Sequence, residues 1–187
     1  MIHSVKFKCI LDTNIIYPLW IRDLLMWFAY YELYTPKWSI NIFDEWIAVM
    51  ERKGIVHDEA LKRAQKMNLA FPDALVQNYE PLIASITLPD LNDRHVLAAA
   101  IKTNADLIIT NNLKDFPSDY LSVFGIKAKT PDDFFTDIID LNHDISIQAF
   151  KKMVLGKKNP PYNEYEVLDI LRNNGLTDTA NYLHALL

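Results

Sequence analysis

Short apolar runs alternate with segments of helical spacing between residues 7 and 141, and this alternation constrains the fold more than any other feature of the sequence. Apolar runs bounded by polar residues predict buried strands, whereas apolar residues three and four positions apart predict helices. Strands that alternate with helices form a parallel sheet with helices on both faces. We therefore predict an α/β fold: a three-layer α/β/α sandwich with a central parallel sheet of four to five strands, plus C-terminal helices.

The predicted strands are short. Lys8–Leu11 and Leu107–Thr110 are apolar runs that end at polar residues, which is typical of buried strands. Three further runs are strand candidates: Leu33–Thr35, Ile86–Leu88 and Lys127–Thr130. With only 4 glycines, the chain lacks the turn residues of an all-β fold and has no glycine-rich phosphate loop.

Capping residues predict where several helices begin. Ser39 is a good N-cap for the helix that follows it, and either Asn92 or Asp93 suits the start of a helix that contains three consecutive alanines. Pro131 fits the first turn of another helix. Helical spacing indicates two more helical segments, at residues 17–33 and 57–70.

The pattern becomes purely helical after residue 142. A helix of about residues 144–155 is followed by the sequence GKKNPP, which interrupts it. Asn163 and Glu166 then have the spacing of a capping box at the start of the next helix. We predict two domains, an α/β domain of residues 1–142 and a helical appendage of residues 143–187.

The net charge limits the possible partners. Lys and Arg together number 19 and Asp and Glu 24, so the formal net charge is −5. Because phosphate affinity comes largely from basic surface, any nucleic-acid role must rest on a local patch or on a metal. Lys151, Lys152, Lys157 and Lys158 form one basic cluster, which is either a solvated helix end or a contact for an RNA backbone or a protein partner.

The N-terminal sequence, the length of the apolar runs and the cysteine content indicate the cellular compartment. The N-terminal sequence MIHSVKFKCILD has no apolar stretch of signal-peptide type, and no run approaches the roughly 18 apolar residues of a membrane span. A single cysteine, Cys9, excludes an intramolecular disulfide and a thiolate zinc cluster. We expect a cytoplasmic protein with no membrane association.

Polar residues follow the predicted strands, and the carboxyl ends of parallel strands meet at one edge of a sheet. The residues expected at this edge are Asp12, Thr13, Asn14, Asp93, Thr110, Asn111, Asn112 and Asp115. Glu45 lies in a helix and can face the same edge. Asp44 is the alternative to Glu45, since a helix turns by about 100° per residue and both side chains cannot face one point equally.

Carboxylates gathered without interleaved basic residues repel one another, which raises some of their pKa values unless a cation is bound. Carboxylate and amide oxygens suit Mg²⁺ or Mn²⁺, which keep several waters and bind substrate phosphates. The pattern therefore predicts metal-assisted hydrolysis of phosphodiester bonds, in which the metal activates water and stabilises the leaving oxygen.

Several segments together resemble a PIN-domain ribonuclease of the VapC type, the toxins of toxin–antitoxin pairs. They are CILDTNIIYP, SINIFDEW, LPDLNDRHVLAAAIKTNADLIITNNLKDFP and the stretch at 131–134. The resemblance covers residues 6–141, and the C-terminal helices are similar to the extension of one VapC-like subgroup. It implies an endoribonuclease that cuts RNA with Mg²⁺ or Mn²⁺, forms a homodimer and is neutralised by a small antitoxin protein.

The resemblance also implies roles for individual residues. The family's first three acids fall on Asp12, Glu45 and Asp93, while the usual fourth position is Asn112, a neutral ligand that would lower metal affinity. Asp115 is the acid that can substitute there. The catalytic residues so implied are Asp12, Glu45, Asp93 and Asp115, and the metal ligands are Asp12, Asp93, Asn112 and Asp115.

Other polar residues near these acids have supporting roles in this interpretation. Asn14 and Thr110 match the family's polar helpers, which hold the first acid and a metal-bound water. Arg94 and Lys114 are candidates for binding the phosphates of RNA. His95 is interpreted as a structural or rim residue, because residues two positions apart on a helix point to different faces.

Two alternative functions stay open. A degenerate PIN fold could bind RNA or a protein without cutting, and Asn112 at the fourth position motivates this alternative. A small-molecule phosphohydrolase on a similar sheet is disfavoured, because Asn14 stands where the second Asp of an Asp-x-Asp nucleophile motif would be.

Overall fold

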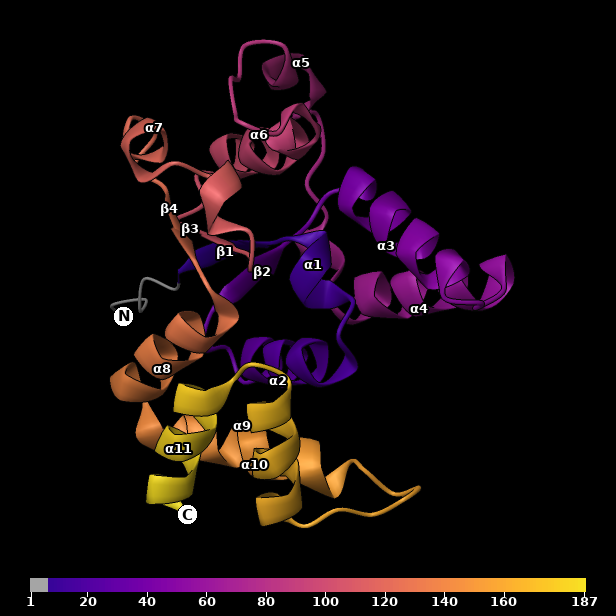
Figure 1. Cartoon of the computed structure of the whole chain (residues 1–187), viewed down its shortest axis with the longest axis vertical. Helices are drawn as coiled ribbons and strands as arrows, with labels where there is room; N and C mark the ends of the chain where they lie inside the picture. The colour runs from indigo at the N-terminus through magenta and orange to yellow at the C-terminus, as the bar shows by residue number, and fades with distance from the viewer. Residues whose placement is uncertain (1–6) are drawn as a thin grey trace. The chain divides into compact units, whose positions relative to one another are not determined.

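The computed structural model describes residues 7–187, so the first half of the segment MIHSVKFKCILD lies outside the described residues. The chain divides into two compact units (Figure 1). The first contains the residues up to Tyr17 together with Thr35–Lys129, and the second contains Pro18–Tyr34 together with Thr130–Leu187. These units group residues 18–34 with the C-terminal helices, and the domain boundary expected at residue 142 stays a prediction.

A parallel sheet of four short strands forms the centre of the first unit (Figure 1). The strands are β1 (Lys8–Leu11), β2 (Thr35–Lys37), β3 (Leu107–Ile109) and β4 (Lys127–Lys129), in the order β2-β1-β3-β4. Leu11 at the end of β1 pairs with Ile109 at the end of β3, so these two strands end side by side. This sheet and its helices confirm the predicted α/β fold class, with four strands among the described residues.

Among its described residues, the first unit also contains six helices and three short 3₁₀ turns. The helices are α1 (Thr13–Ile16), α3 (Ile40–Arg52), α4 (His57–Ala70), α5 (Glu80–Ile83), α6 (Arg94–Thr103) and α7 (Ser118–Ser122), and the turns are η1 (Pro72–Ala74), η2 (Leu91–Asp93) and η3 (Leu113–Asp115). Helix α3 begins where predicted, because Ser39 Oγ accepts a hydrogen bond from the Ile42 amide at 3.3 Å. The buried alanines of α6 let this helix pack closely on β1 and β3.

Two sequence-based strand predictions need correction. Ile86–Leu88 is not a strand: the Ile86 and Leu88 side chains are buried, but the Thr87 amide donates to the Tyr120 hydroxyl at 3.1 Å. The strand predicted at Leu33–Thr35 begins instead at Thr35, because the Leu33 amide still donates to a carbonyl of the preceding helix, that of Phe28, at 3.0 Å.

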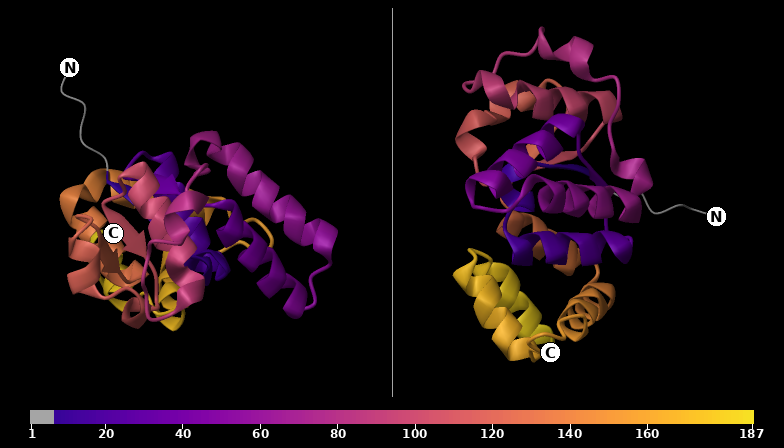
Figure 2. Two further views of the ribbon diagram at one scale, coloured as in Figure 1. Left: turned by 90° about the horizontal axis from the view of Figure 1, so that it is seen from above. Right: turned by 90° about the vertical axis from the view of Figure 1, so that its right-hand side faces the viewer.

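The second unit is helical. It contains α2 (Leu19–Tyr30), α8 (Pro131–Leu141), α9 (His143–Leu155), α10 (Glu164–Asn173) and α11 (Thr177–Leu186). Helices α10 and α11 lie side by side (Figure 2), α2 packs on α9, and α11 packs on α8. The Phe28 and Phe135 rings meet edge to face at 5.2 Å between centroids. Asn163 and Glu166 form the predicted capping box.

The basic cluster of the second unit is partly used within that unit. Lys157 forms an ion pair with Asp23, and its ammonium group lies 4.4 Å from the centre of the Trp20 ring. Lys151, Lys152 and Lys158 are exposed. One of the four lysines is therefore engaged in packing, and three are available to solvent or a partner.

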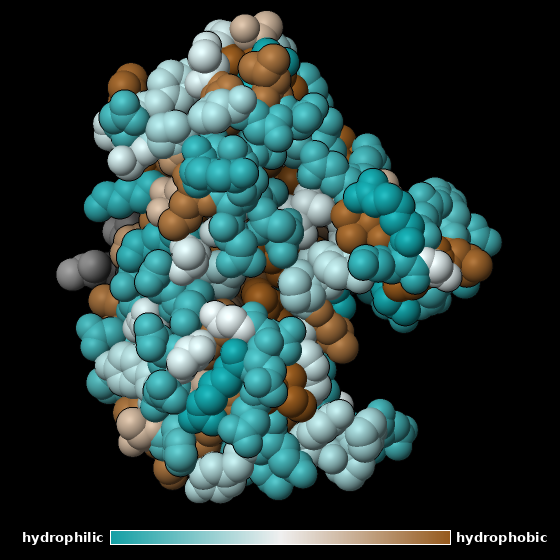
Figure 3. Space-filling model, in the orientation of Figure 1, coloured by the Kyte–Doolittle hydropathy of each residue, from teal (hydrophilic) through white to brown (hydrophobic). Residues whose placement is uncertain are grey.

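The surface is mainly hydrophilic on the face seen in Figure 3, where apolar side chains are scattered. Among residues 7–187, none of the helices combines the length and the hydropathy that a membrane crossing needs.

Candidate functional site

Asp12 is held where two neighbouring strands end. It follows β1 and is the N-cap of α1, and its side chain is buried. The carboxylate accepts hydrogen bonds from the Thr13 amide at 2.6 Å, from Asn14 Nδ2 at 2.5 Å and from Thr110 Oγ1 at 2.7 Å. Because Thr110 directly follows β3, the parallel pairing of β1 with β3 brings this hydroxyl to the carboxylate.

Asn14 and Thr110 extend this network into the loop after β3. The Asn14 amide nitrogen lies 2.9 Å from Thr110 Oγ1, and its Oδ1 accepts from the Asn111 backbone amide at 3.0 Å. The Asn112 backbone amide donates to Thr110 Oγ1 at 3.0 Å. Both predicted helper residues therefore contact Asp12, and they connect it to the loop of residues 111–112.

Glu45 projects from α3 toward the same place. The Thr13 hydroxyl donates to its Oε2 at 2.5 Å, and His95 Nε2 lies 2.7 Å from its Oε1. Asp44, the alternative weighed from the sequence, is exposed and is not among the residues that line this pocket. Of the two neighbouring acids, Glu45 is therefore the one that faces Asp12.

The sequence predicts that His95 is a structural or rim residue, and the structure places it in direct contact with Glu45. It is buried in α6, and it contacts Glu45 of α3, a residue 50 positions earlier in the chain. The sequence around Asp93 and His95 does not indicate the contact between His95 and Glu45, because this contact arises only when α3 packs near α6. His95 orients Glu45 and does not occupy the rim.

Asp93 lies at the end of η2, in the N-cap position of α6, but its side chain makes no capping hydrogen bond. Instead, Asp90 Oδ1 accepts from the Asn92 amide at 2.8 Å and caps the preceding turn. The Oδ2 atom of Asp93 is buried and has no hydrogen-bond partner within residues 7–187. A capping role therefore does not account for this side chain.

The electrostatics separate the three acids. Burial is the largest cause that raises the pKa of Asp93, the neighbouring charges of Asp12, Asp90 and Asp115 add to it, and together they bring the pKa to about 6. Burial also raises the pKa of Asp12, partly offset by its hydrogen bonds from Thr110 and Thr13.

Glu45 differs from the other two acids. Burial acts to raise its pKa, but the hydrogen bonds from His95 and Thr13 outweigh burial, and the net shift is downward. Glu45 is thus the most readily ionised of the three.

The remaining predicted ligands lie beside this cluster. Asp115 is buried in η3, and the Asn112 side-chain amide donates a hydrogen bond to its Oδ2. Asp115 is close enough for its charge to raise the pKa of Asp93. Neither Asn112 nor Asp115 is among the residues that line the pocket.

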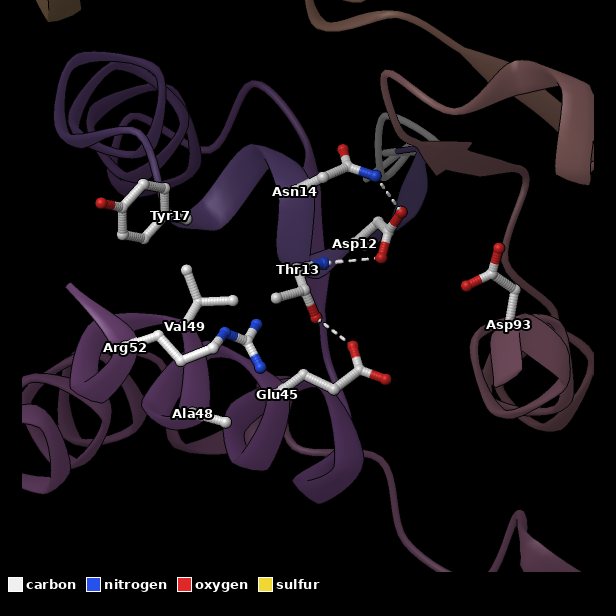
Figure 4. A pocket seen from close by; sticks show the side chains of 9 residues that line it. All are labelled: Asp12, Thr13, Asn14, Tyr17, Glu45, Ala48, Val49, Arg52 and Asp93. Atoms are coloured by element: carbon white, nitrogen blue, oxygen red, sulfur yellow. Dashed lines mark hydrogen bonds between the residues drawn. The ribbon is translucent and has the colours of Figure 1, made fainter. Parts of the chain in front are cut away.

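A pocket of about 540 Å³ connects the first three acids. It is lined by Asp12, Thr13, Asn14, Tyr17, Glu45, Ala48, Val49, Arg52 and Asp93 (Figure 4). Arg94 and Lys114, the predicted phosphate contacts, do not line it, and Arg94 Nε donates to the Leu91 carbonyl at 2.9 Å. Their contact with RNA stays a prediction.

Tyr17 and Arg52 are pocket residues that the sequence interpretation missed. A usable signal existed for Arg52, because Ala48, Val49 and Arg52 lie three, four and seven residues after Glu45 and so share one face of α3 with it.

The residues of the pocket suit a divalent cation of the Mg²⁺ type. No group of three His, Cys, Asp or Glu side chains within residues 7–187 is placed to hold one ion on its own. However, Mg²⁺ is commonly bound by only one or two carboxylates together with waters and substrate phosphates. Two carboxylates with raised pKa values, one of which has a buried oxygen without a partner, provide such a donor set.

Comparisons with known proteins agree with this geometry. Residues 8–114 match the family model described as PIN domain, and residues 131–185 match the model described as VapC50 C-terminal domain. The chain is 41% identical over 98 residues to "Putative ribonuclease VapC50" of Mycobacterium tuberculosis (strain ATCC 25618 / H37Rv). That match covers 52% of this chain and 57% of the relative, so it spans little more than half of either protein. The comparison with solved structures gave no match.

Proposed function

Because the chain belongs to the PIN-domain family and its C-terminal part matches the VapC50 C-terminal domain, we propose that it is a metal-dependent endoribonuclease and the toxin of a toxin–antitoxin pair. The family membership confirms the resemblance seen in the sequence. The observation that carries the proposed activity is the pocket in which Asp12, Glu45 and Asp93 meet, with one buried carboxylate oxygen of Asp93 left without a partner.

Asp12 and Asp93 are the residues that would hold Mg²⁺ or Mn²⁺, with Asn112 and Asp115 as further candidate ligands beside them. The bound ion would supply Lewis-acid activation of water and stabilisation of the leaving oxygen. The chain's contribution is rigidity: three donors fix the Asp12 carboxylate, so little reorganisation is needed when a ligand arrives.

Glu45 would act as the proton acceptor. Its lowered pKa keeps the carboxylate ionised at neutral pH, and His95 and Thr13 hold it by one oxygen each. A carboxylate oxygen has two lone pairs, so each oxygen keeps the capacity to accept a proton from an attacking water. His95 and Thr13 are positioning residues in this scheme, since they act through Glu45.

The partners follow from the proposed toxin role. RNA is the substrate, a cognate antitoxin protein is the inhibitor, and the site of action is the cytoplasm. The word ribonuclease in the name of the relative supports the substrate class. A homodimer through α2 would use its exposed residues Leu19 and Tyr30, because Leu24, Leu25 and Phe28 of this helix are buried.

A second candidate function is a PIN domain that binds RNA or protein without cutting. The observation that favours it is the pairing of Asn112 with Asp115 at the position of the fourth acid, in a site where no three His, Cys, Asp or Glu side chains of residues 7–187 are placed to hold one metal ion. Metal dependence of cleavage separates the two functions.

The deciding experiment is cleavage of end-labelled RNA by the purified, antitoxin-free chain in Mn²⁺, in Mg²⁺ and in chelator. Asp12→Asn, Asp93→Asn and Glu45→Gln should each abolish metal-dependent cleavage. Asp44→Asn is the matched control, because it removes one exposed carboxylate next to Glu45 and should cut like the unaltered protein. Cleavage that survives Asp12→Asn or the chelator would show that this pocket is not the active site.

A further inference from the structure

One face of α3 carries a second set of pocket residues beyond Glu45. Ala48, Val49 and Arg52 follow Glu45 along this face, while the opposite side of the helix is buried through Phe43, Trp46 and other apolar residues. Figure 4 shows these residues toward one end of the pocket and Asp93 at the other. The pocket therefore has an acidic end and an end with different chemistry.

Arg52 is the cation at this second end of the pocket. Its side chain is exposed, lines the pocket, and makes no hydrogen bond or ion pair with any residue of the range 7–187. The neighbouring acid Glu51 is engaged elsewhere, with His57 Nδ1 at 2.8 Å. A position in the last turn of α3 favours any basic residue. Lys53, the C-cap residue that follows, lies at the same helix end and does not line the pocket, so the preference for a basic residue does not by itself place Arg52 in the pocket.

Tyr17 provides an aromatic surface near the Arg52 guanidinium. It is the residue that ends α1, is partly buried, and lines the pocket together with Ala48 and Val49. Figure 4 shows the Tyr17 ring on the same side of the pocket as Val49 and Arg52. An aromatic ring, two aliphatic side chains and one guanidinium match the two parts of a nucleotide, a flat apolar base and an anionic phosphate.

We propose that Tyr17, Ala48, Val49 and Arg52 form a subsite for one nucleotide of single-stranded RNA, next to the phosphate that is cut. The base lies against Tyr17 and the aliphatic residues, and the Arg52 guanidinium donates hydrogen bonds to a phosphate oxygen of the strand. This subsite rests on the proposed ribonuclease function and deepens it by naming the form of the substrate.

Charge and size support this occupant. Three carboxylates at the acidic end repel a phosphate chain in a protein of net charge −5, so a strand needs a local cation to enter the pocket. The volume of about 540 Å³ is within the range of small-molecule pockets and far larger than a metal ion requires. A base can reach an aromatic side chain only when it is unstacked, which selects a single strand over a duplex.

The test measures binding separately from cleavage. A 5′-fluorescein-labelled dodecamer of adenylate is titrated by fluorescence anisotropy in Mg²⁺ against the full chain that carries Asp12→Asn, which prevents cutting. On this background, Arg52→Gln is compared with Lys53→Gln, an equal change of charge one residue outside the pocket. Tyr17→Leu is compared with Tyr17→Phe, which keeps the ring. Thermal unfolding verifies that each variant is folded.

Arg52→Gln should weaken binding about tenfold and Tyr17→Leu by a similar factor, in line with the loss of one charged hydrogen bond or one stacked base. Lys53→Gln and Tyr17→Phe should stay within about twofold of the background. The subsite is wrong if each variant binds like its control, or if the dodecamer does not bind at all.

The outcome also separates the subsite from the proposed function. Binding that depends on Arg52 and Tyr17, in a protein that never cuts RNA with any metal, supports the subsite and overturns the nuclease. Metal-dependent cleavage that is lost in Asp12→Asn, combined with binding that ignores Arg52 and Tyr17, supports the nuclease and overturns the subsite.

Discussion

Asp12 and Asp93 line one pocket, yet their carboxylates differ in their hydrogen bonds. Asp12, between the ends of β1 and β3, accepts hydrogen bonds from three donors. Asp93, at the end of η2, has a buried Oδ2 without any partner in residues 7–187. Burial raises the pKa of both groups. The difference indicates that Asp12 is part of the folded framework, whereas Asp93 is left open for a ligand.

The largest expected effect is the loss of stability when Asp12 is removed, which should have no counterpart when Asp93 is removed. Asp12→Ala should lower the free energy of unfolding by about 2–4 kcal/mol, because the Thr13 amide, Asn14 and Thr110 lose their shared acceptor in a buried place. Asp93→Ala should leave it unchanged or raise it, since Oδ2 has no partner to lose. Urea unfolding in chelator measures both. Equal losses in the two variants would contradict the comparison.

The next effect is a pH dependence of stability that belongs to Asp93. Its pKa is about 6 in the folded protein, above the ordinary value of 3.8, so between these values the folded state binds more protons than the unfolded state. In chelator, the contribution of Asp93 to stability should therefore fall as pH rises from about 4 to 6 and stay low above that.

Asp93→Asn should remove this pH dependence. The measurement is the difference in Tm between the unaltered protein and Asp93→Asn at several pH values in chelator. The difference should favour the variant at pH 8 and shrink toward pH 4. A difference in Tm that is constant across this pH range would mean that the pKa of Asp93 is not raised in the folded protein.

A smaller effect concerns how Glu45 is positioned. His95→Leu removes the hydrogen bond to Glu45 Oε1 and should lower kcat for RNA cleavage about tenfold with little change in KM, as for the loss of a residue that orients a site carboxylate. His95→Gln keeps a donor and should recover part of this loss. A purely structural role would instead lower Tm in both variants and leave kcat of the folded fraction unchanged.

The smallest expected effect is at the position of the fourth acid. Asn112→Asp replaces the amide that donates to Asp115 by a carboxylate, so it should cost about 1 kcal/mol of stability in chelator. The added charge should also tighten Mg²⁺ binding, because the new carboxylate lies next to an existing one. Calorimetry with Mg²⁺ checks the second expectation, and unchanged or weaker binding would remove residue 112 from the metal site.

The local features were predictable from the sequence because neighbouring residues determine them. Ser39 starts α3, and Asn163 with Glu166 starts α10, since capping depends on residues three positions apart. Ile86–Leu88 shows the limit of the same reasoning. The run is buried as its composition predicts, but a side chain, Tyr120, takes the backbone amide of Thr87 that a neighbouring strand would have used.

The residues of the site also divide into those whose contacts the sequence predicts and those whose contacts it does not. The sequence by itself determined that Asp12 and Thr110 meet, because the carboxyl ends of parallel strands share one edge whatever covers the sheet. Only the tertiary structure decided that His95 contacts Glu45 and that Tyr17 and Arg52 face the pocket. Strands pair through regularly repeating backbone hydrogen bonds, and short apolar runs in the sequence indicate where such strands lie. The approach of two helices depends instead on how their side chains fill the space between them, and no spacing along the chain records that distance.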